Sequence, residues 1–394
     1  MKKRLFILTL IMMLCINTIQ AFADSGSAKS ENSGAADNIS DIPSIISKAV
    51  SRSSSVKAKE SALRNEQTSY DDAFDASIKI DHRLLKKYKD YFINVRDILP
   101  LDAKYNLFAA ENSLESTQNY VTASLYEQYI SLIKILNDME YHNVVLQNEK
   151  DNLSAMQKKY SIGIVSIKQI EEQQRNLKKA ELNLSTDEFK RDMAILDLNT
   201  EAGAAIDENY NSLNAASTLN IELLKNNIDM KDIYNIKSFD DCLKEALESR
   251  EEILNANEYL KTKESQFEKI KTAYPNKKDT HEVDAMNNIA DAKASVNSAK
   301  FQVEKGLRDN YEGIIKKINE INNDKDQLNI KKTDYETIKV KNEKGLISAA
   351  EVQNSYIEYS ELENDITDSE YDLYLLKLKF SYLCGIGMGQ NTSK

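Results

Sequence analysis

The chain has 394 residues, with 52 Lys or Arg against 63 Asp or Glu, so its formal net charge is −11. An acidic chain argues against nucleic acid, and against an anionic membrane face, as partners. It contains only 10 glycines and 3 prolines, whereas an average chain has about 7% and about 5% of these residues. Few turn-forming residues predict few turns, and therefore a small number of very long elements.

The first 23 residues predict a signal peptide. Basic residues at 2–4 precede a largely apolar run at 5–16, and Ala21-Phe22-Ala23 has the small-x-small pattern that signal peptidase accepts. The alternative is an uncleaved membrane anchor, which needs about 20 apolar residues, more than this run supplies. We therefore expect export across the cytoplasmic membrane.

Residues 24–40 are rich in Ser, Gly, Ala, Asn and Asp, which predicts a flexible leader. The three prolines then punctuate the chain. Pro43 is expected to open the first helix. Pro100 and Pro275 are expected to lie between long helices and to mark chain reversals, because proline interrupts a helix interior.

An internal repeat organises the remaining sequence. Residues 160–166 (Tyr-Ser-Ile-Gly-Ile-Val-Ser) align with residues 342–348 (Asn-Glu-Lys-Gly-Leu-Ile-Ser), and the alignment continues without a gap until Gly203 meets Gly385. We expect two copies of one unit. They are residues 41–203 and 238–388, joined by an Asn-rich linker or equatorial segment at 204–237 and followed by a tail at 389–394.

Each unit is expected to be one long helix flanked by two shorter helices stacked in line. The long tracts, at 103–161 and 284–343, would each reach roughly 90 Å at the rise of an α-helix. The shorter partners are expected at 41–76 with 166–201, and at 238–273 with 348–383.

Heptad spacing predicts a coiled-coil seam in both units. In the second unit, apolar side chains recur every seventh residue at Val352, Tyr359, Ile366, Leu373 and Phe380. In the first, the same track carries Ile170, Leu177, Leu184 and Leu198, with Arg191 interrupting it.

Two cysteines, Cys242 and Cys384, remain after the predicted signal peptide. In an oxidising compartment these two cysteines can form one disulfide. We favour two separate buried thiols, because the first unit carries Ala202 where the second carries Cys384.

The turn that follows the first long tract, residues 159–170, is similar to the hairpin motif of TolC-type efflux proteins. An aromatic residue stands three places before a glycine, and a branched apolar residue and a serine follow; the motif recurs at residues 344–352. The resemblance implies an all-α fold of two tandem long antiparallel helical hairpins. It also implies a homotrimer, in which three chains form a tapered helical cylinder.

The resemblance places the hairpin tips at one end of that cylinder, where an adaptor docks. The acidic tip position of the family falls on Gln169 and Glu351, and its aromatic on Tyr160 but on Asn342 in the second unit. Independently of any family, a helix–turn–helix needs a residue that accepts positive φ. The candidate tip residues are Tyr160, Gly163, Ile164, Ser166, Gln169, Gly345, Leu346, Ser348 and Glu351.

Family members that insert in outer membranes carry two strands in each half, which close a β-barrel. Around Pro275 the sequence has only a polar turn, without alternating segments of about ten residues. Around Pro100, only residues 77–81 and 91–95 are candidates for short strands. We expect the barrel strands to be absent. The protein would then lie in the cell envelope, in a periplasm or on an extracellular face, without inserting in an outer membrane.

The sequence carries no catalytic motif. It has no phosphate-binding loop, His-Glu-x-x-His, Gly-x-Ser-x-Gly or Cys-x-x-Cys, so we expect neither an enzyme nor a cofactor or metal site. The acidic run from Glu361 to Glu370 is interpreted as a solvated helix face, with a cation-attracting lumen as the alternative.

The resemblance therefore implies a duct that works with a membrane-fusion adaptor and an inner-membrane exporter. The alternative is a non-conducting coiled-coil scaffold of the cell envelope, built from the same helices.

Overall fold

The computed structural model describes residues 42–80, 88–201, 221–226, 228–275 and 280–389. The predicted signal peptide and leader, the first part of the linker and Gly203 lie outside these residues. Within them every regular element is helical and no β-strand is present. The elements are α3 (Ile42–Arg52), α4 (Ser54–Ile78), α5 (Lys89–Ile93), the π-helical turn η2 (Asn94–Ile98), α6 (Leu99–Ser161), α7 (Ile167–Glu201), α9 (Ile221–Lys225), α10 (Phe239–Ser249), α11 (Glu251–Ala273), α12 (Thr280–Glu343) and α13 (Ala349–Cys384).

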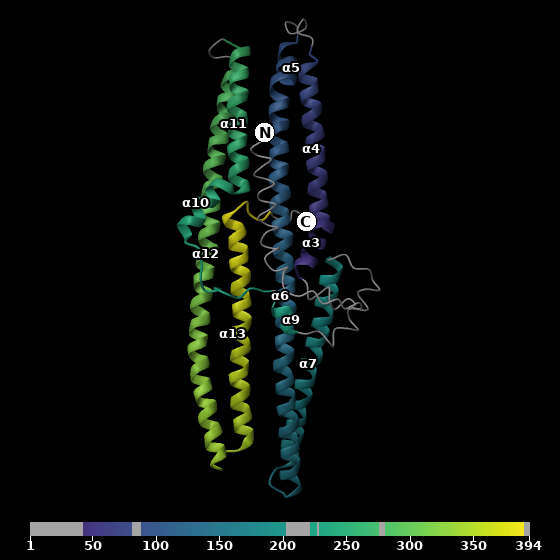
Figure 1. Ribbon diagram of the computed structural model, residues 1–394, viewed down its shortest axis with the longest axis vertical. Helices are drawn as coiled ribbons and strands as arrows, with labels where there is room; N and C mark the ends of the chain where they lie inside the picture. Colours follow the sequence, from purple (N-terminus) through teal and green to yellow (C-terminus); the bar gives the residue numbers. More distant parts are fainter. Residues whose placement is uncertain (1–41, 81–87, 202–220, 227, 276–279, 390–394) are drawn as a thin grey trace, which may run out of the picture.

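The helices form two elongated units that lie side by side (Figure 1). In the first unit α4 and α7 pack end to end along α6, and in the second α11 and α13 pack end to end along α12. Helices α11 and α13 also contact α6, which joins the two units. The predicted fold, two tandem helical hairpin units built on two long helices, is confirmed.

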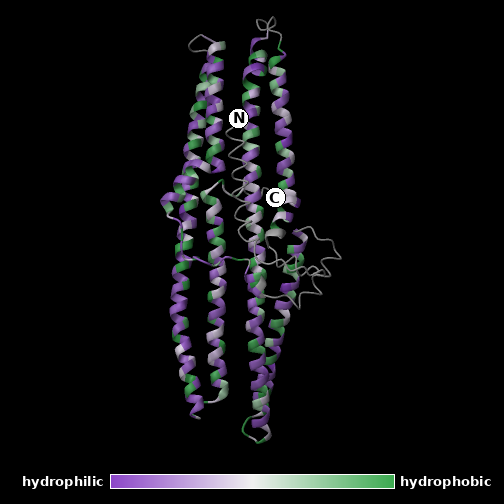
Figure 2. Cartoon of the chain, viewed as in Figure 1, coloured by the Kyte–Doolittle hydropathy of each residue, from purple (hydrophilic) through white to green (hydrophobic). Residues whose placement is uncertain are grey.

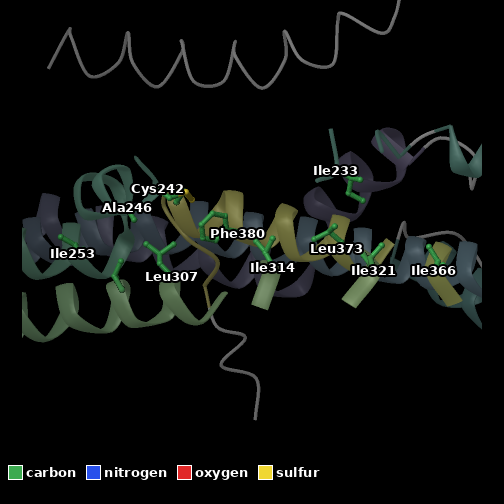
Figure 3. Packing of buried hydrophobic residues seen from close by; sticks show 12 residues of the cluster. Ile233, Cys242, Ala246, Ile253, Leu307, Ile314, Ile321, Ile366, Leu373 and Phe380 are labelled. Carbon is green, nitrogen blue, oxygen red and sulfur yellow. A yellow bond between two sulfur atoms is a disulfide. The ribbon is translucent and has the colours of Figure 1, made fainter. Parts of the chain in front are cut away.

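The seam of the second unit follows the predicted heptads. Ile366, Leu373 and Phe380 of α13 are buried against Ile314 and Ile321 of α12 (Figure 3). Val352 and Tyr359, nearer the tip, are only partly buried. The heptad spacing therefore identifies the side of α13 that faces α12. Side chains on this side are more buried the farther they lie from the tip.

The seam of the first unit is more polar. Ile170 and Leu198 of α7 are buried, whereas Arg191 is partly buried and pairs with Asp192 at 2.8 Å. Arg191, which interrupts the apolar track, therefore still lies in the seam, and Asp192 neutralises the charge of its guanidinium. Asp187 is only 2% exposed and contacts His142 at 2.5 Å and Lys190 at 3.0 Å. Buried charge in this seam is thus paired.

The segment before α6 differs from the prediction. Residues 91–95, a candidate strand, belong to α5 and η2, and the described part of the other candidate, 77–80, closes α4. Pro100 lies in the first turn of α6, and helix continues through it from Lys89. In η2 the Leu99 N–H donates to the carbonyl of Asn94, five residues back. This wider turn lets the helix accept a proline, which has no N–H to donate.

The two cysteines are bonded to each other, so the preference for separate thiols was wrong. Cys242 of α10 and Cys384, the last residue of α13, form a disulfide across 142 residues of sequence (Figure 3). Both are buried in the core of the second unit. The bond fixes the short helix α10 to the end of α13 that lies far from the turn.

A C-terminal strap, residues 385–389, continues from this bond and crosses to the first unit. The Glu251 N–H donates to the Ile386 carbonyl at 2.9 Å, and the Asn119 side chain donates to the Gly387 carbonyl at 3.0 Å. Gly387 has φ +97°, and a Cβ there would lie 2.8 Å from the Arg250 guanidinium. Gly389, the first residue of the predicted tail, donates its N–H to the Ser116 carbonyl at 2.9 Å. The strap therefore ties α11 and α6 together.

The acidic run of α13 is divided between two neighbours. Glu370 pairs with Lys325 of α12 at 2.7 Å and accepts from the Tyr234 hydroxyl at 2.5 Å. Asp368 instead lies toward α6, 3.9 Å from Lys134. These carboxylates lie at helix–helix contacts, so the interpretation as one solvated face was wrong for them.

Candidate docking surface at the hairpin tips

The two hairpin turns have the same backbone geometry. Gly163 has φ +75° and Gly345 has φ +72°, in the left-handed region that glycine accepts without strain. At the first tip the Gly163 N–H donates to Tyr160 and the Ile164 N–H to Lys159, each at 2.9 Å. This pair of bonds is a Schellman motif, which satisfies the last carbonyls of α6.

The second tip closes in the same way. The Gly345 N–H donates to the carbonyl of Asn342 at 2.8 Å, and the Leu346 N–H donates to Lys341 at 2.9 Å. The Asn342 side chain adds a bond that the first tip lacks, because its Nδ2 donates to the Ile347 carbonyl at 2.8 Å. Asparagine in place of the aromatic thus has a role in the turn. The sequence analysis missed it, although an amide near a helix C-terminus is a usual sign of local capping.

A serine starts the return helix at each tip. The Ser348 N–H donates to the Glu351 carboxylate at 2.7 Å, and the Glu351 N–H donates back to Ser348 Oγ at 3.3 Å. Ser166 and Gln169 form the corresponding pair, at 2.8 Å and 3.4 Å. This is a capping box, and the Ser-x-x-Glu and Ser-x-x-Gln spacing was available in the sequence as its signal.

The capping box explains the electrostatics of Glu351. Hydrogen bonds from the Ser348 backbone, and then from its hydroxyl, lower the pKa of this carboxyl. Glu351 and Gln169 accept equivalent bonds with oxygens of different charge. The tip position that the family fills with an acid therefore fixes the start of a helix in this chain.

The apex of each turn presents apolar side chains to solvent. Ile162 and Ile164 are 71% and 66% exposed, and Leu346 is 70% exposed. Tyr160 is also exposed. Both turns lie at the same end of the molecule (Figure 1). The structure thus brings the candidate tip residues of each unit together in its own turn, and leaves the largest of them uncovered.

Alanine substitutions distinguish these glycines from those inside helices. Gly163→Ala and Gly345→Ala are expected to lower the free energy of unfolding by about 1 kcal/mol each, because alanine is strained at positive φ. As matched controls, Gly306→Ala and Gly313→Ala inside α12, where the added Cβ meets nothing within 4 Å, are expected to raise it by about 0.5–1 kcal/mol. Urea denaturation measures both, and equal effects at the two kinds of site would contradict the turn geometry.

The described residues contain neither a metal site nor a helix suited to a membrane. No group of three or more His, Cys, Asp or Glu side chains there is placed to hold a metal ion. Among the described helices, none combines the length and the apolar character that crossing a membrane requires.

Comparison with solved structures identifies the fold. The outer membrane protein VceC of Vibrio cholerae has a TM-score of 0.62 and 12% sequence identity, over 89% of this chain and 97% of that one. The CmeC outer membrane channel of Campylobacter jejuni has a TM-score of 0.58 and 14% identity, over 94% and 92%. The open state of the MtrE channel of Neisseria gonorrhoeae has a TM-score of 0.58 and 12% identity, over 94% and 96%.

No family model and no curated protein matches the sequence. The fold that the tip-motif resemblance implied is nevertheless confirmed by these structures, which are an outer membrane protein and two outer membrane channels. The likeness extends over nearly the whole of each chain.

Proposed function

We propose that this chain, which has the TolC-type fold, is an exported, non-enzymatic duct component of an efflux or secretion system in the cell envelope. It would act as a homotrimer, with a membrane-fusion adaptor and an inner-membrane exporter as partners at its tip end. The observation that supports this most is the pair of identically built turns at one end of a channel-type fold. Two Schellman turns with uncovered apolar apices are expected of a docking surface.

The edges of the protomer favour a ring. On α7, Leu182 and Phe189 are both 66% exposed and one heptad apart. On α12, Ile330 is 63% exposed. These two helices form opposite edges of the lower part of the molecule (Figure 1). Two different unpartnered apolar edges suit a heterologous contact that closes a ring, rather than a two-fold dimer.

The mass of the protein in solution tests whether it forms the proposed trimeric ring. Light scattering after size exclusion is expected to give about three times the mass of a single chain, which is 44.8 kDa when the predicted signal peptide is included. Leu182→Asn with Phe189→Asn is expected to shift the protein toward monomer, since it places polar groups in the proposed contact. A wild-type chain that stays monomeric over a wide concentration range would overturn the duct and favour the envelope scaffold.

An export assay tests whether the hairpin tips are needed for function. Gly163→Val together with Gly345→Val is expected to abolish export while circular dichroism shows unchanged helix content, because a β-branched residue strains the turn at positive φ. The matched control, Gly306→Val with Gly313→Val, changes the same residue type at sites far from the turns. Wild-type export by the tip variant would contradict a role for these turns.

A further inference from the structure

The charge at the first hairpin tip is opposite to that of the whole chain. Residues 152–170 contain Lys158, Lys159 and Lys168 and no Asp or Glu, although the chain carries a net charge of −11. The aligned residues 334–352 of the second tip contain Lys339, Lys341 and Lys344 against Asp334, Glu336, Glu343 and Glu351. All six lysines are exposed. The first tip is therefore basic, and the charge of the whole chain does not describe it.

The tip lysines also differ from those of the shaft in their partners. On the shaft, Lys325 pairs with Glu370 at 2.7 Å, and Lys379 pairs with Glu127 at 2.9 Å. In the described part of the chain, none of the six tip lysines forms an ion pair or side-chain hydrogen bond. Their positive charge is available to an external partner.

Aliphatic side chains project between these lysines. Ile162, Ile164 and Leu346 are the most exposed large apolar residues of the two turns, and Ile167 beside them is 55% exposed. Figure 2 shows the apolar turn at the extreme end of the α6–α7 hairpin. Neither turn lines the two surface hollows beside Phe239 and Tyr234, which lie on the shaft.

We propose that the tip end of this protein binds the surface of an anionic phospholipid bilayer. The lysine ammonium groups contact headgroup phosphates, and Ile162, Ile164 and Leu346 insert among the lipids. Long lysine side chains reach a charged interface while aliphatic neighbours enter it, which is the pattern of interfacial anchors. Both apices lie at the same end of the molecule, so one broad surface can contact both of them (Figure 1). The inference extends the proposed function and does not require the trimer.

Vesicle co-sedimentation of the purified full chain tests the lysines. Binding is expected with vesicles of phosphatidylglycerol and phosphatidylcholine and not with phosphatidylcholine alone, and it should weaken when salt shortens the Debye length. Since each lysine near an anionic surface contributes roughly five-fold in affinity, Lys158→Gln, Lys159→Gln and Lys168→Gln together should weaken binding by roughly 100-fold. The control, Lys293→Gln, Lys300→Gln and Lys305→Gln in α12, removes equal charge from exposed shaft positions and should change binding little.

A second variant tests the apolar contribution. Ile162→Asn, Ile164→Asn and Leu346→Asn should weaken binding at least about ten-fold, while Phe74→Asn with Ile78→Asn, two exposed positions on α4, should not. Absence of binding at low salt, equal binding to neutral vesicles, or equal losses in tip and shaft variants would overturn the proposal. Light scattering on the same samples separates the two ideas. A trimer that ignores vesicles overturns only membrane binding, and a monomer that binds them overturns only the ring.

Discussion

Replacing Cys242 by alanine is expected to lower the free energy of unfolding by about 4 kcal/mol, and replacing Cys384 should cost the same. The disulfide joins residues 142 apart in sequence, and closing so long a loop removes much of the conformational freedom of the unfolded chain. The double substitution is expected to cost no more than either single one, because each single change already removes the bond. Two independent buried thiols would instead give smaller costs that add.

Urea denaturation of the two single variants and the double variant measures this directly. The Cys384→Ala variant restores the residue that the sequence of the first unit has at the aligned position, Ala202. Maleimide labelling of the denatured protein without residues 1–23, which contain Cys15, is the control for the redox state. Without reductant it should find no free thiol. Additive small losses together with two labelled cysteines would contradict the bond.

The long helices were predictable because their determinants are local. Turn-forming residues are scarce between residues 101 and 161, and heptads place Ile366, Leu373 and Phe380 on one face, so length and packing direction follow from composition and spacing. The tip glycines were predictable for the same reason, since a reversal between two helices requires a left-handed residue. Both predictions depend only on residues close to one another in sequence.

The features that were missed depend on the tertiary arrangement. Whether Cys242 bonds with Cys384 depends on where α10 lies against α13, which no residue near either cysteine reveals. The C-terminal strap is specified by Asn119 of α6 and by Arg250, which lies between α10 and α11. The candidate strand at residues 91–95 was misassigned because a short apolar run fits either structure, and packing against neighbouring helices decides between them.

The contact between α6 and α13 makes stability depend on pH through Asp368. Burial, together with the nearby charges of Asp138 and Asp372, raises the pKa of this carboxyl from 3.8 to about 6. The Lys134 ammonium and the Asn137 amide act in the opposite direction, but the buried Asn137 Nδ2 and Asp368 Oδ1 do not reach hydrogen-bond geometry with any partner. The folded state therefore favours the protonated carboxyl.

Asp368→Asn is expected to raise the free energy of unfolding by about 2 kcal/mol at pH 8 and by little at pH 4. Since the folded pKa lies above the unfolded one, the stability linked to protonated Asp368 is fully present below about pH 3.8 and is lost as the pH rises through about 6. The amide resembles the protonated acid at every pH, and Lys134 keeps Asp372 at 2.9 Å as a partner.

Urea denaturation between pH 4 and pH 8 checks this, with Glu361→Gln, an exposed carboxyl on the same helix, as the control for net charge. The advantage of Asp368→Asn should grow through the interval between the two pKa values and then stay level, whereas the control should show no such step. A loss of stability at pH 8 would instead show that the ionised carboxylate and Lys134 hold α13 against α6.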